Sequence, residues 1–422
     1  MASTNGQWLT SAAASARLGV KLATLYAYAS RGLITSLPGD GQRGRLYASD
    51  DVERLLTRHT ARSGHGPVAA SALRFGEPVL ETRISDVDAG GPRYRGRHAI
   101  ALCRAGIGFE RVAELLWTGE LPSEAQPAAP HASLRCDAKR LWPLLKGSAT
   151  LPKMSLIVGA LALGDDDRHA ASDAAEHARA RGLLRWLAHA PAPRPPRDLR
   201  STKPIAFTLL EALQAPLTPA RVRATDRALV LCAEHELNAS AFAARVAASA
   251  GADLYACLVA ALSTLSGSAH GGMCDRVEAL LDVIGKPARA TRTVREWLAR
   301  GEQIPGFGHP LYPKGDPRGA YLVELARAER GASTHPKGCA KSESARTAFA
   351  LLDAMAGGGH PAPTLDAGLV TLCHCLDLPR GSAATIFALG RSAGWVAHAL
   401  EQRAAGYVLR PRARYVGVPP LA

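Results

Sequence analysis

Residues 305–318 read Pro-Gly-Phe-Gly-His-Pro-Leu-Tyr-Pro-Lys-Gly-Asp-Pro-Arg, a glycine-rich loop around one histidine. Three more polar stretches stand in an Ala- and Leu-rich background: 233–240 (Ala-Glu-His-Glu-Leu-Asn-Ala-Ser), 266–272 (Ser-Gly-Ser-Ala-His-Gly-Gly) and 363–369 (Pro-Thr-Leu-Asp-Ala-Gly-Leu). Glycine allows a backbone or a ligand to approach closely. The chain has 14 histidines, and a single one is more often a packed or surface residue than a catalytic one. Only the four stretches together indicate a site.

His270 lies among small residues, directly before a predicted helix over 273–283. The N-terminus of a helix presents free N–H groups and a partial positive charge. This field lowers the pKa of a histidine and favours neutral imidazole, which can donate a hydrogen bond to a developing enolate oxygen. His270 is therefore a candidate for stabilising an enolate.

The chain resembles the citrate synthase family in motifs that follow one another in the family's order: Glu-His-Glu-Leu-Asn-Ala-Ser at 234–240, His-Gly-Gly at 270–272, Gly-Phe-Gly-His at 306–309 with Asp-Pro-Arg at 316–318, and Thr-Leu-Asp-Ala-Gly at 364–368. The resemblance runs from about Glu81 to Gly417. It implies an all-α, two-domain fold with a large and a small helical domain. The weak β-alternation and the 5% aromatic content agree with a helical main domain.

The resemblance also implies an activity, the condensation of acetyl-CoA with oxaloacetate to give citrate and CoA. The alternative is 2-methylcitrate synthesis from propionyl-CoA. One methylene is worth only about 1–3 kcal/mol of discrimination, and the sequence does not fix that pocket. Acyl-CoA is a co-substrate in either reaction, and we expect no permanently bound cofactor and no metal.

By the resemblance, three residues carry the chemistry. His270 polarises the thioester carbonyl, Asp366 takes the α-proton, and His309 protonates the oxo-acid carbonyl as the new bond forms. The resemblance further implies that the substrate carboxylates are bound by His235, Arg318, Arg391 and Arg410. Because the family's counterpart of Arg410 reaches into the partner subunit's site, a homodimer is expected.

For CoA, the resemblance implies that the backbone of Ile304, Pro305 and Gly306 cradles the adenine side. Many family members have a basic residue four positions after the histidine of the 306–309 motif, for CoA phosphate. This chain has Pro313 there, and Lys314 beside it is the candidate substitute. The arginine-rich substrate set fits a dicarboxylate, because a guanidinium pairs with a carboxylate through two hydrogen bonds.

The bulk composition fits an enzyme of this kind. The chain has 422 residues, 47% hydrophobic and 21% charged, as in a folded globular protein. No apolar run reaches the ~18 residues that a membrane span needs, and the N-terminus does not read as a signal peptide. The eight cysteines are scattered, so reduced thiols in the cytoplasm are expected.

Residues 8–58 read as a separate unit, with a helix capped by Thr10 and ended by Gly19, a second helix with Leu25 and Tyr26 inward, and a glycine-rich loop over 39–45. This order resembles the winged helix-turn-helix of MerR-type proteins. The resemblance implies that DNA is contacted by Lys21, Thr24, Tyr28, Arg43 and Arg45. Residues 1–60 carry seven Lys/Arg and four Asp/Glu, so little of the +14 net charge lies there.

Two interpretations of this unit stay open, a DNA-binding head and a scaffold that packs on the enzyme or carries a partner. A regulator whose synthase body senses citrate or CoA esters is the corresponding alternative for the whole chain. The predicted organisation is a MerR-like domain (1–60), a linker (61–80), the first part of the large helical domain (81–221), the small helical domain (222–330) and the second part of the large domain (331–422).

Overall fold

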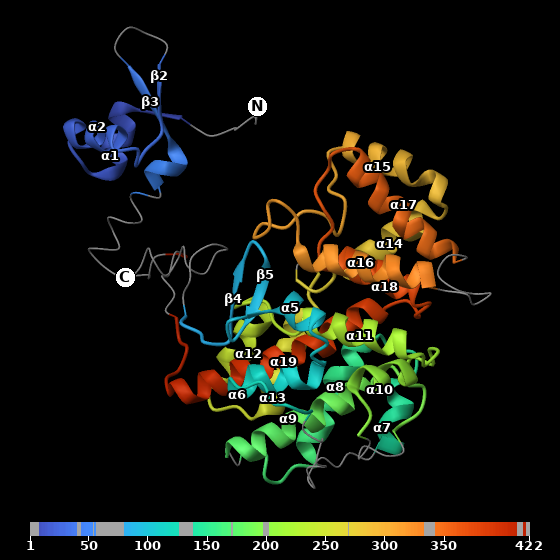
Figure 1. Ribbon diagram of the computed structural model, residues 1–422. Coiled ribbons are helices and arrows are strands. Elements are labelled where there is room, and N and C mark those ends of the chain that lie inside the picture. Colours follow the sequence, from blue (N-terminus) through green and yellow to red (C-terminus); the bar gives the residue numbers. More distant parts are fainter. Residues whose placement is uncertain are drawn as a thin grey trace. The chain divides into compact units, whose positions relative to one another are not determined.

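The computed structural model describes residues 8–39, 44–53, 55, 80–125, 138–169, 172–196, 202–268, 270–332, 342–411 and 417–418. Contacts divide the chain into two compact units, a first unit of Met1–Glu81 with Pro411–Ala422 and a second unit of Thr82–Arg410. Figure 1 labels most of their helices and strands.

The first unit combines short helices with an antiparallel sheet of strand order β1-β3-β2. Its elements are β1 (Trp8–Thr10), α1 (Ser11–Leu18), α2 (Leu22–Ser30), β2 (Ser36–Pro38) and β3 (Arg45–Ala48). The Thr10 hydroxyl accepts the N–H of Ala13, and Gly19 ends α1 at φ +63°. Both ends of the predicted first helix are therefore confirmed.

The first unit has a small core of its own, made of Ala14, Leu18, Leu25, Ile34, Tyr47, Val52 and Leu55. Leu25 is fully buried, as predicted, but Tyr26 is 50% exposed. Placing both inside was wrong, because successive residues of a helix point about 100° apart and a core this small covers only one of them. Of the residues expected to meet DNA, Lys21 and Arg45 are exposed, Thr24 and Tyr28 are half-buried, and Arg43 lies outside the described residues.

The second unit begins with a small antiparallel sheet made of β4 (Ser85–Asp88), β5 (Gly91–Tyr94) and β6 (Arg97–His98). Helices follow: α5 (Ala99–Arg104), α6 (Phe109–Thr118), α7 (Ala138–Leu145), α8 (Thr150–Leu163), α9 (Asp173–Ala188), α10 (Ile205–Ala212), α11 (Pro219–Cys232), α12 (Ala239–Ser249), α13 (Leu254–Leu265), α14 (Met273–Ile284), α15 (Ala290–Ala299), α16 (Pro317–Ala332), α17 (Glu343–Gly357), α18 (Leu365–Cys375) and α19 (Ser382–Ala405). The predicted mostly helical fold is confirmed.

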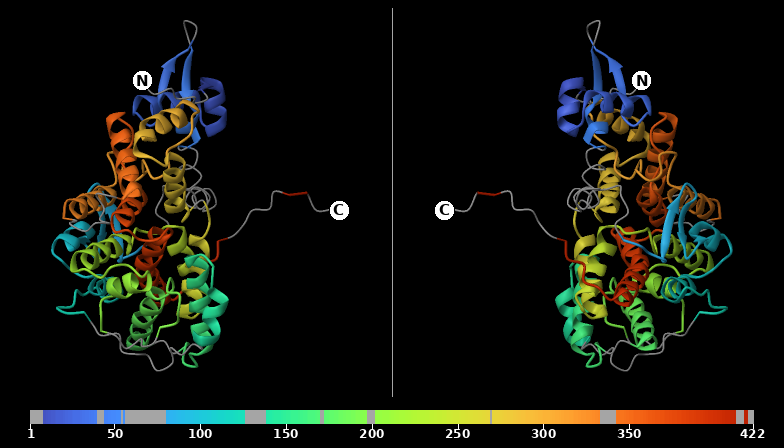
Figure 2. Two further views of the ribbon diagram at one scale, coloured as in Figure 1. Left: turned by 90° about the vertical axis from the view of Figure 1, so that its right-hand side faces the viewer. Right: turned by 90° about the vertical axis from the view of Figure 1, so that its left-hand side faces the viewer.

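The helices of the second unit pack in two groups. The long α19 lies among α6, α11, α12 and α13, and α8 packs on α13 (Figures 1 and 2). Helices α14, α17 and α18 pack with one another, with α15 on α17 and α16 on α18. This grouping differs from the predicted small domain over 222–330, because α11, α12 and α13 pack on α19. Residue spacing identifies helices but does not say which helix each one packs on.

Close backbone approach places α19 against the end of α11. A Cβ at Gly390 would lie 2.7 Å from the Cβ of Cys232, and one at Gly394 would lie 2.0 Å from Oε2 of Glu234. Glycine at these two positions allows α19 to approach the segment that follows α11. Arg391 lies between them and is brought next to that segment.

Candidate active site

The segment between α11 and α12 holds the first polar motif. The chain leaves the helical conformation between α11 and α12, where Glu236 takes φ +57° and the Asn238 side chain caps α12. His235 is 9% exposed, and its Nε2 lies 2.8 Å from the Tyr312 hydroxyl. The break therefore presents His235 to the loop of the 305–318 motif.

A buried network holds Glu234, the neighbour of His235. Its Oε1 accepts from the Ser85 hydroxyl at 3.2 Å and lies 3.1 Å from Nε2 of His398. Nδ1 of His398 accepts from Nε of Arg245 at 2.9 Å, so Nε2 carries the His398 proton and donates to Glu234. Burial opposes ionisation of Glu234, but His398, Arg391 and a backbone N–H together lower its pKa. A fixed negative charge thus lies beside the site.

Backbone hydrogen bonds join two loops, of which one carries His309 and the other leads into α18 and Asp366. Thr364 donates its N–H to the Gly306 carbonyl at 2.8 Å, and Gly308 donates to the Ala362 carbonyl at 3.0 Å. Gly306 has φ +81°, and a Cβ there would lie 2.6 Å from Cγ2 of Val277. The first loop therefore requires glycine to lie against α14 and α18.

Arg318 is held by a buried ion pair at the start of α16. Asp316 accepts its backbone N–H at 3.0 Å, its Nε at 3.0 Å and its Nη2 at 2.8 Å. The second oxygen of Asp316 also accepts the N–H of Leu365 at 3.0 Å, which ties the pair to the residue before Asp366. Burial would raise the pKa of Asp316, but Arg318 and these hydrogen bonds lower it.

His235, His309 and Tyr312 form a ring cluster. The centroids of the two imidazoles are 5.5 Å apart in an edge arrangement, and Tyr312 lies 5.0 Å from His309 and 5.7 Å from His235. Burial, then the charges of Arg318, Arg391 and His309, lowers the pKa of His235 well below its usual value. Burial and Arg318 lower the pKa of His309 against the opposing charges of Asp316 and Asp366. Both imidazoles are therefore neutral near pH 7.

His270 lies just before α14 and reaches back to α12. Its Nε2 is 2.9 Å from the Ser240 hydroxyl, which also accepts the indole N–H of Trp395 at 3.1 Å. Ser240 further lies 2.7 Å from Oδ1 of Asn238. The pKa of His270 is lowered, in the predicted direction, but the causes are burial and then the Arg391 charge.

Asp366 is the second residue of α18 and lies over the start of α14. Its Oδ1 accepts from Sγ of Cys274 at 3.3 Å, and its Oδ2 accepts from the Thr364 hydroxyl at 3.4 Å. Burial raises its pKa above the usual value, against the lowering effects of Cys274 and Arg318. The carboxyl is thus made more basic than an exposed aspartate.

Mutual electrostatic effects show that the motifs meet. The Arg391 charge lowers the pKa of both His235 and His270, and the Arg318 charge lowers that of His235 and His309. Arg391 is 2% exposed and donates Nε to the Cys232 carbonyl at 2.7 Å. Six predicted residues therefore gather in one region: His235, His270, His309, Arg318, Asp366 and Arg391.

The other predicted residues lie less centrally. Ile304 is buried, Pro305 is half-buried and Gly306 is packed against α14 and α18, whereas Lys314 is exposed. Arg410 is exposed at the end of the second unit, one residue after Leu409, whose N–H donates to the Ser249 hydroxyl. The structure does not bring Lys314 or Arg410 to the buried cluster.

Sequence reasoning missed Ser240, Cys274, Tyr312 and Trp395 as contacts of the predicted residues. Ser240 and Tyr312 stand inside quoted motifs, and Cys274 follows the His-Gly-Gly motif by two residues. Their positions in the motifs were a usable signal. Trp395 had none, because it meets Ser240 across 155 positions of the chain.

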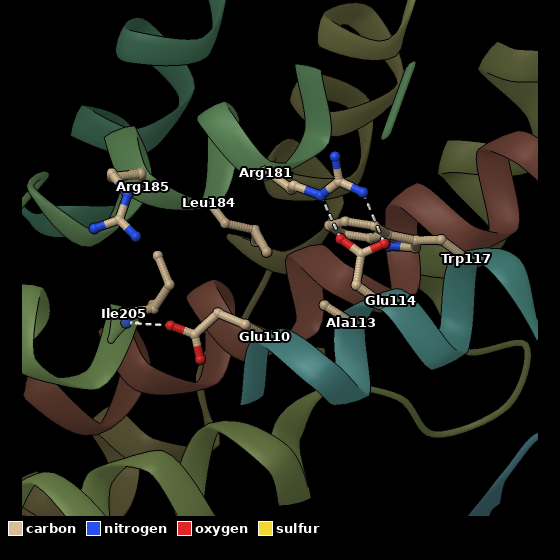
Figure 3. Close-up of a pocket in the computed structure, with 8 residues that line it drawn as sticks. All are labelled: Glu110, Ala113, Glu114, Trp117, Arg181, Leu184, Arg185 and Ile205. Atoms are coloured by element: carbon tan, nitrogen blue, oxygen red, sulfur yellow. Dashed lines mark hydrogen bonds and ion pairs between the residues drawn. The ribbon is translucent and has the colours of Figure 1, made fainter. Parts of the chain in front are cut away.

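A separate cavity of about 20 Å³ lies among α6, α9 and the start of α10 (Figure 3). Its charged lining is already partnered, since Arg181 pairs with Glu114 and the N–H of Ile205 donates to Glu110 at 2.5 Å. A cavity of this size holds about one water molecule. It is too small for a CoA ester or an oxo acid.

Comparison with known proteins identifies the family. Residues 74–412 match the sequence model described as "Citrate synthase, C-terminal domain". The chain belongs to the citrate synthase family. Enzymes of this family transfer an acyl group from acyl-CoA onto oxaloacetate.

Relatives in the citrate synthase family carry two different names. A 2-methylcitrate synthase of Mycobacterium tuberculosis is 33% identical over 340 residues, covering 77% of this chain and 84% of the relative. A citrate synthase of Mycolicibacterium smegmatis is 31% identical over 384 residues, covering 85% and 98%. Both reactions considered from the sequence are therefore found among its relatives.

Solved structures of citrate synthases share the fold. The enzyme from Pyrobaculum aerophilum aligns with a TM-score of 0.69 at 26% identity, over 82% of this chain and 92% of that one. The enzyme from Thermoplasma acidophilum, in a ternary complex with carboxymethyl coenzyme A and oxaloacetate, aligns with a TM-score of 0.71 at 24% identity, over 84% and 97%. Within the described residues, no helix is long and apolar enough to cross a membrane.

Proposed function

We propose that this chain condenses acetyl-CoA with oxaloacetate to give citrate and CoA, with 2-methylcitrate synthesis from propionyl-CoA as the alternative. The observation that carries the proposal is the gathering of two neutral imidazoles and a basic carboxylate around buried arginines. Burial lowers the pKa of both imidazoles and raises the pKa of the carboxyl, which are the directions that a neutral hydrogen-bond donor and a stronger base require.

In this mechanism Asp366 takes a proton from the α-carbon of the thioester. The α-proton is weakly acidic, so the base needs a donor at the carbonyl oxygen, and His270 supplies it. Since Nε2 of His270 faces Ser240, the other ring nitrogen, Nδ1, is left for the thioester. In the structure the Ser240 hydroxyl donates to Oδ1 of Asn238 at 2.7 Å. Because a hydroxyl has a single proton, it has to turn from Asn238 to Nε2 of His270 for Nδ1 to carry the imidazole proton.

The enolate carbon then attacks the carbonyl carbon of oxaloacetate. His309 gives its ring proton to the carbonyl oxygen as it becomes a hydroxyl, and takes a proton back from solvent to return to neutral imidazole. Water then hydrolyses the citryl-CoA thioester to citrate and CoA, and Asp366 releases the proton that it took from the thioester. The oxo-acid carboxylates are bound by His235, Arg318 and Arg391, with Arg410 supplied by the partner subunit. The two guanidiniums are buried, and each lies near one acidic side chain: Arg318 near Asp316, and Arg391 near Glu234.

The test is CoA thiol release with oxaloacetate and either acetyl-CoA or propionyl-CoA. Wild type should turn over one ester well above the other, and the ratio of kcat/KM names the reaction. Asp366→Ala and His270→Ala should each lose about 100-fold or more in kcat. Wild type that releases no CoA from either ester would overturn the proposal.

We also propose the homodimer. Helix α8 packs its buried residues on α13, yet Leu156 and Leu163 on its other side are 52% and 86% exposed. An apolar helix face uncovered in the single chain fits a partner helix. Light scattering should give twice the chain mass, and Leu156→Asp with Leu163→Asp should give a monomer. A monomeric wild type would contradict it.

For the first unit we propose DNA binding by a winged helix-turn-helix. Support comes from α1 and α2 joined by a glycine turn, and from the exposed side chains of Lys21 and Arg45. The scaffold alternative is favoured by Leu22 and Tyr26 of α2, which are 44% and 50% exposed. A gel shift with the chain's own upstream DNA that weakens with salt and with Lys21→Ala supports the first. Equal, weak binding to all sequences supports the second.

We further propose a cytoplasmic location. The free thiols of buried cysteines such as Cys103 and Cys232 support it, because reduced thiols are typical of that compartment. Fractionation of cells that produce the chain would test it, and enzyme found outside the cytosolic fraction would contradict it.

A further inference from the structure

Cys274 contacts the base of the proposed reaction. It is the second residue of α14, is 1% exposed and lies with Sγ 3.3 Å from Oδ1 of Asp366. The other oxygen, Oδ2, accepts from the Thr364 hydroxyl at the longer distance of 3.4 Å. We propose that Cys274 is a positioning residue, whose thiol holds Oδ1 of Asp366 and leaves Oδ2 to take the α-proton. This proposal rests on the proposed function.

The thiol stays protonated, so it can only donate to the carboxylate. Burial, and then the charge of Asp366, raises the pKa of Cys274 well above its usual value. A thiolate 3.3 Å from a carboxylate in a buried site would place two negative charges side by side. The S–H group therefore donates, and the carboxylate accepts, throughout the pH range of enzyme assays.

Other groups also act on Asp366 from the elements packed around it. Arg318 of α16 lowers its pKa and Asp316 raises it, while His309 of the neighbouring loop and Cys232 of α11 lie within electrostatic reach. The Arg318 and Asp316 charges oppose each other. Cys274 can be replaced without changing any of these charges, so its contribution can be measured by substitution.

The choice of sulfur has a chemical consequence. S–H is a weak hydrogen-bond donor, so it orients the carboxylate while withdrawing little of the basicity that proton abstraction needs. A hydroxyl would stabilise the carboxylate form more strongly and lower its pKa, whereas a methyl group would leave Oδ1 without its donor and raise the pKa. Two substitutions of nearly the same size thus predict opposite shifts.

The test is the pH dependence of kcat/KM for the acyl-CoA substrate. In Cys274→Ser the acid limb should move to lower pH and kcat should fall, and in Cys274→Ala the limb should move to higher pH, each by about half a unit or more. A role in packing alone would move both limbs in the same direction or neither. Shifts of equal sign, or no shift, in folded variants would overturn the proposal.

Cys257 offers the matched control. It is a fully buried cysteine of α13 whose Sγ contacts the Ala252 carbonyl at 3.8 Å, away from Asp366. Cys257→Ser and Cys257→Ala should leave the acid limb where it is. If one Cys274 variant fails to fold, the direction in which the acid limb moves in the other variant still tests the proposal.

A spectroscopic readout uses the wild-type enzyme without turnover. The infrared difference between wild type and Cys274→Ala isolates the S–H stretch of Cys274. That band should shift as pH falls through the acid limb, because its acceptor becomes a neutral carboxylic acid. A band that does not change with pH would reject the contact with Asp366. A wild type with no synthase activity but with a titrating band would reject the proposed function and not the contact.

Discussion

The substitution Asp316→Asn removes the negative charge of the buried ion pair between Asp316 and Arg318 and leaves the size of the side chain nearly unchanged. Asp316 is 2% exposed and accepts from Arg318 and Leu365 through four hydrogen bonds. Asparagine retains one accepting oxygen and places an NH₂ group against the remaining donors. Arg318, 3% exposed, is left as a buried charge without its counter-ion.

Breaking a buried ion pair from one side costs about 3–5 kcal/mol, so the free energy of unfolding in urea should fall by that amount. The KM for oxaloacetate should rise as well, because Arg318 loses its orientation. Asp353→Asn is the matched control, since Asp353 faces Arg327 at 4.0 Å with both side chains more than 60% exposed. It should leave stability nearly unchanged.

The same pair predicts a pH dependence with a definite sign. Because the folded-state pKa of Asp316 is lowered, its contribution is complete above its unfolded pKa of about 3.9. It is lost as pH falls through the lower, folded pKa. Asp316→Asn should therefore remove part of the acid denaturation below about pH 4. A loss in stability below 1 kcal/mol at pH 7, or an unchanged KM, would refute the assigned role of the pair.

Three further outcomes are expected. Ser240→Ala should lower kcat about tenfold with little change in KM, because His270 loses the hydroxyl that orients its ring. Stopped-flow measurement of turnover tests this. An unchanged kcat would contradict the tautomer assigned to His270. Gly368→Ala should lower the free energy of unfolding by about 1–3 kcal/mol and should lower kcat, because a Cβ there would lie 2.7 Å from the Gly319 carbonyl oxygen. Gly357→Ala is the control and should change neither quantity, since a Cβ at Gly357 would meet no neighbouring atom within 4 Å. Lys314→Ala should raise KM for the acyl-CoA several-fold at low salt while kcat holds, and a salt-independent KM would argue against its role with phosphate.

Much of the fold was accessible from motif order. Gly-Phe-Gly-His, His-Gly-Gly and Thr-Leu-Asp-Ala-Gly predicted a citrate synthase family member, and the family and the helical fold are confirmed. Caps such as Thr10 and glycine ends such as Gly19 follow from local chemistry, so the sequence predicts them well. The roles of the individual site residues stay predictions until the variants are measured.

Tertiary choices could not be predicted in the same way. The inward placement of Tyr26 failed because its exposure depends on how much core the first unit has. The small domain over 222–330 differed from the observed helix groups because packing partners such as α12 and α19 are far apart in the chain. The Cys274 contact with Asp366 spans 92 positions, and no periodicity connects them.

The anchoring of His270 has a consequence for timing. The imidazole is hydrogen-bonded to Ser240, which is hydrogen-bonded in turn to Trp395 of one helix group. Asp366 and His309 belong to the other group, where backbone hydrogen bonds join the two loops next to them. A rocking of one group against the other would change the spacing between electrophile and base in a single movement. A thioester that bound before the oxo acid would then find His270 and Asp366 at the wrong spacing and would not react. Proton abstraction from the thioester would then depend on the relative position of the two helix groups. It would begin only after binding of the oxo acid has brought the groups together.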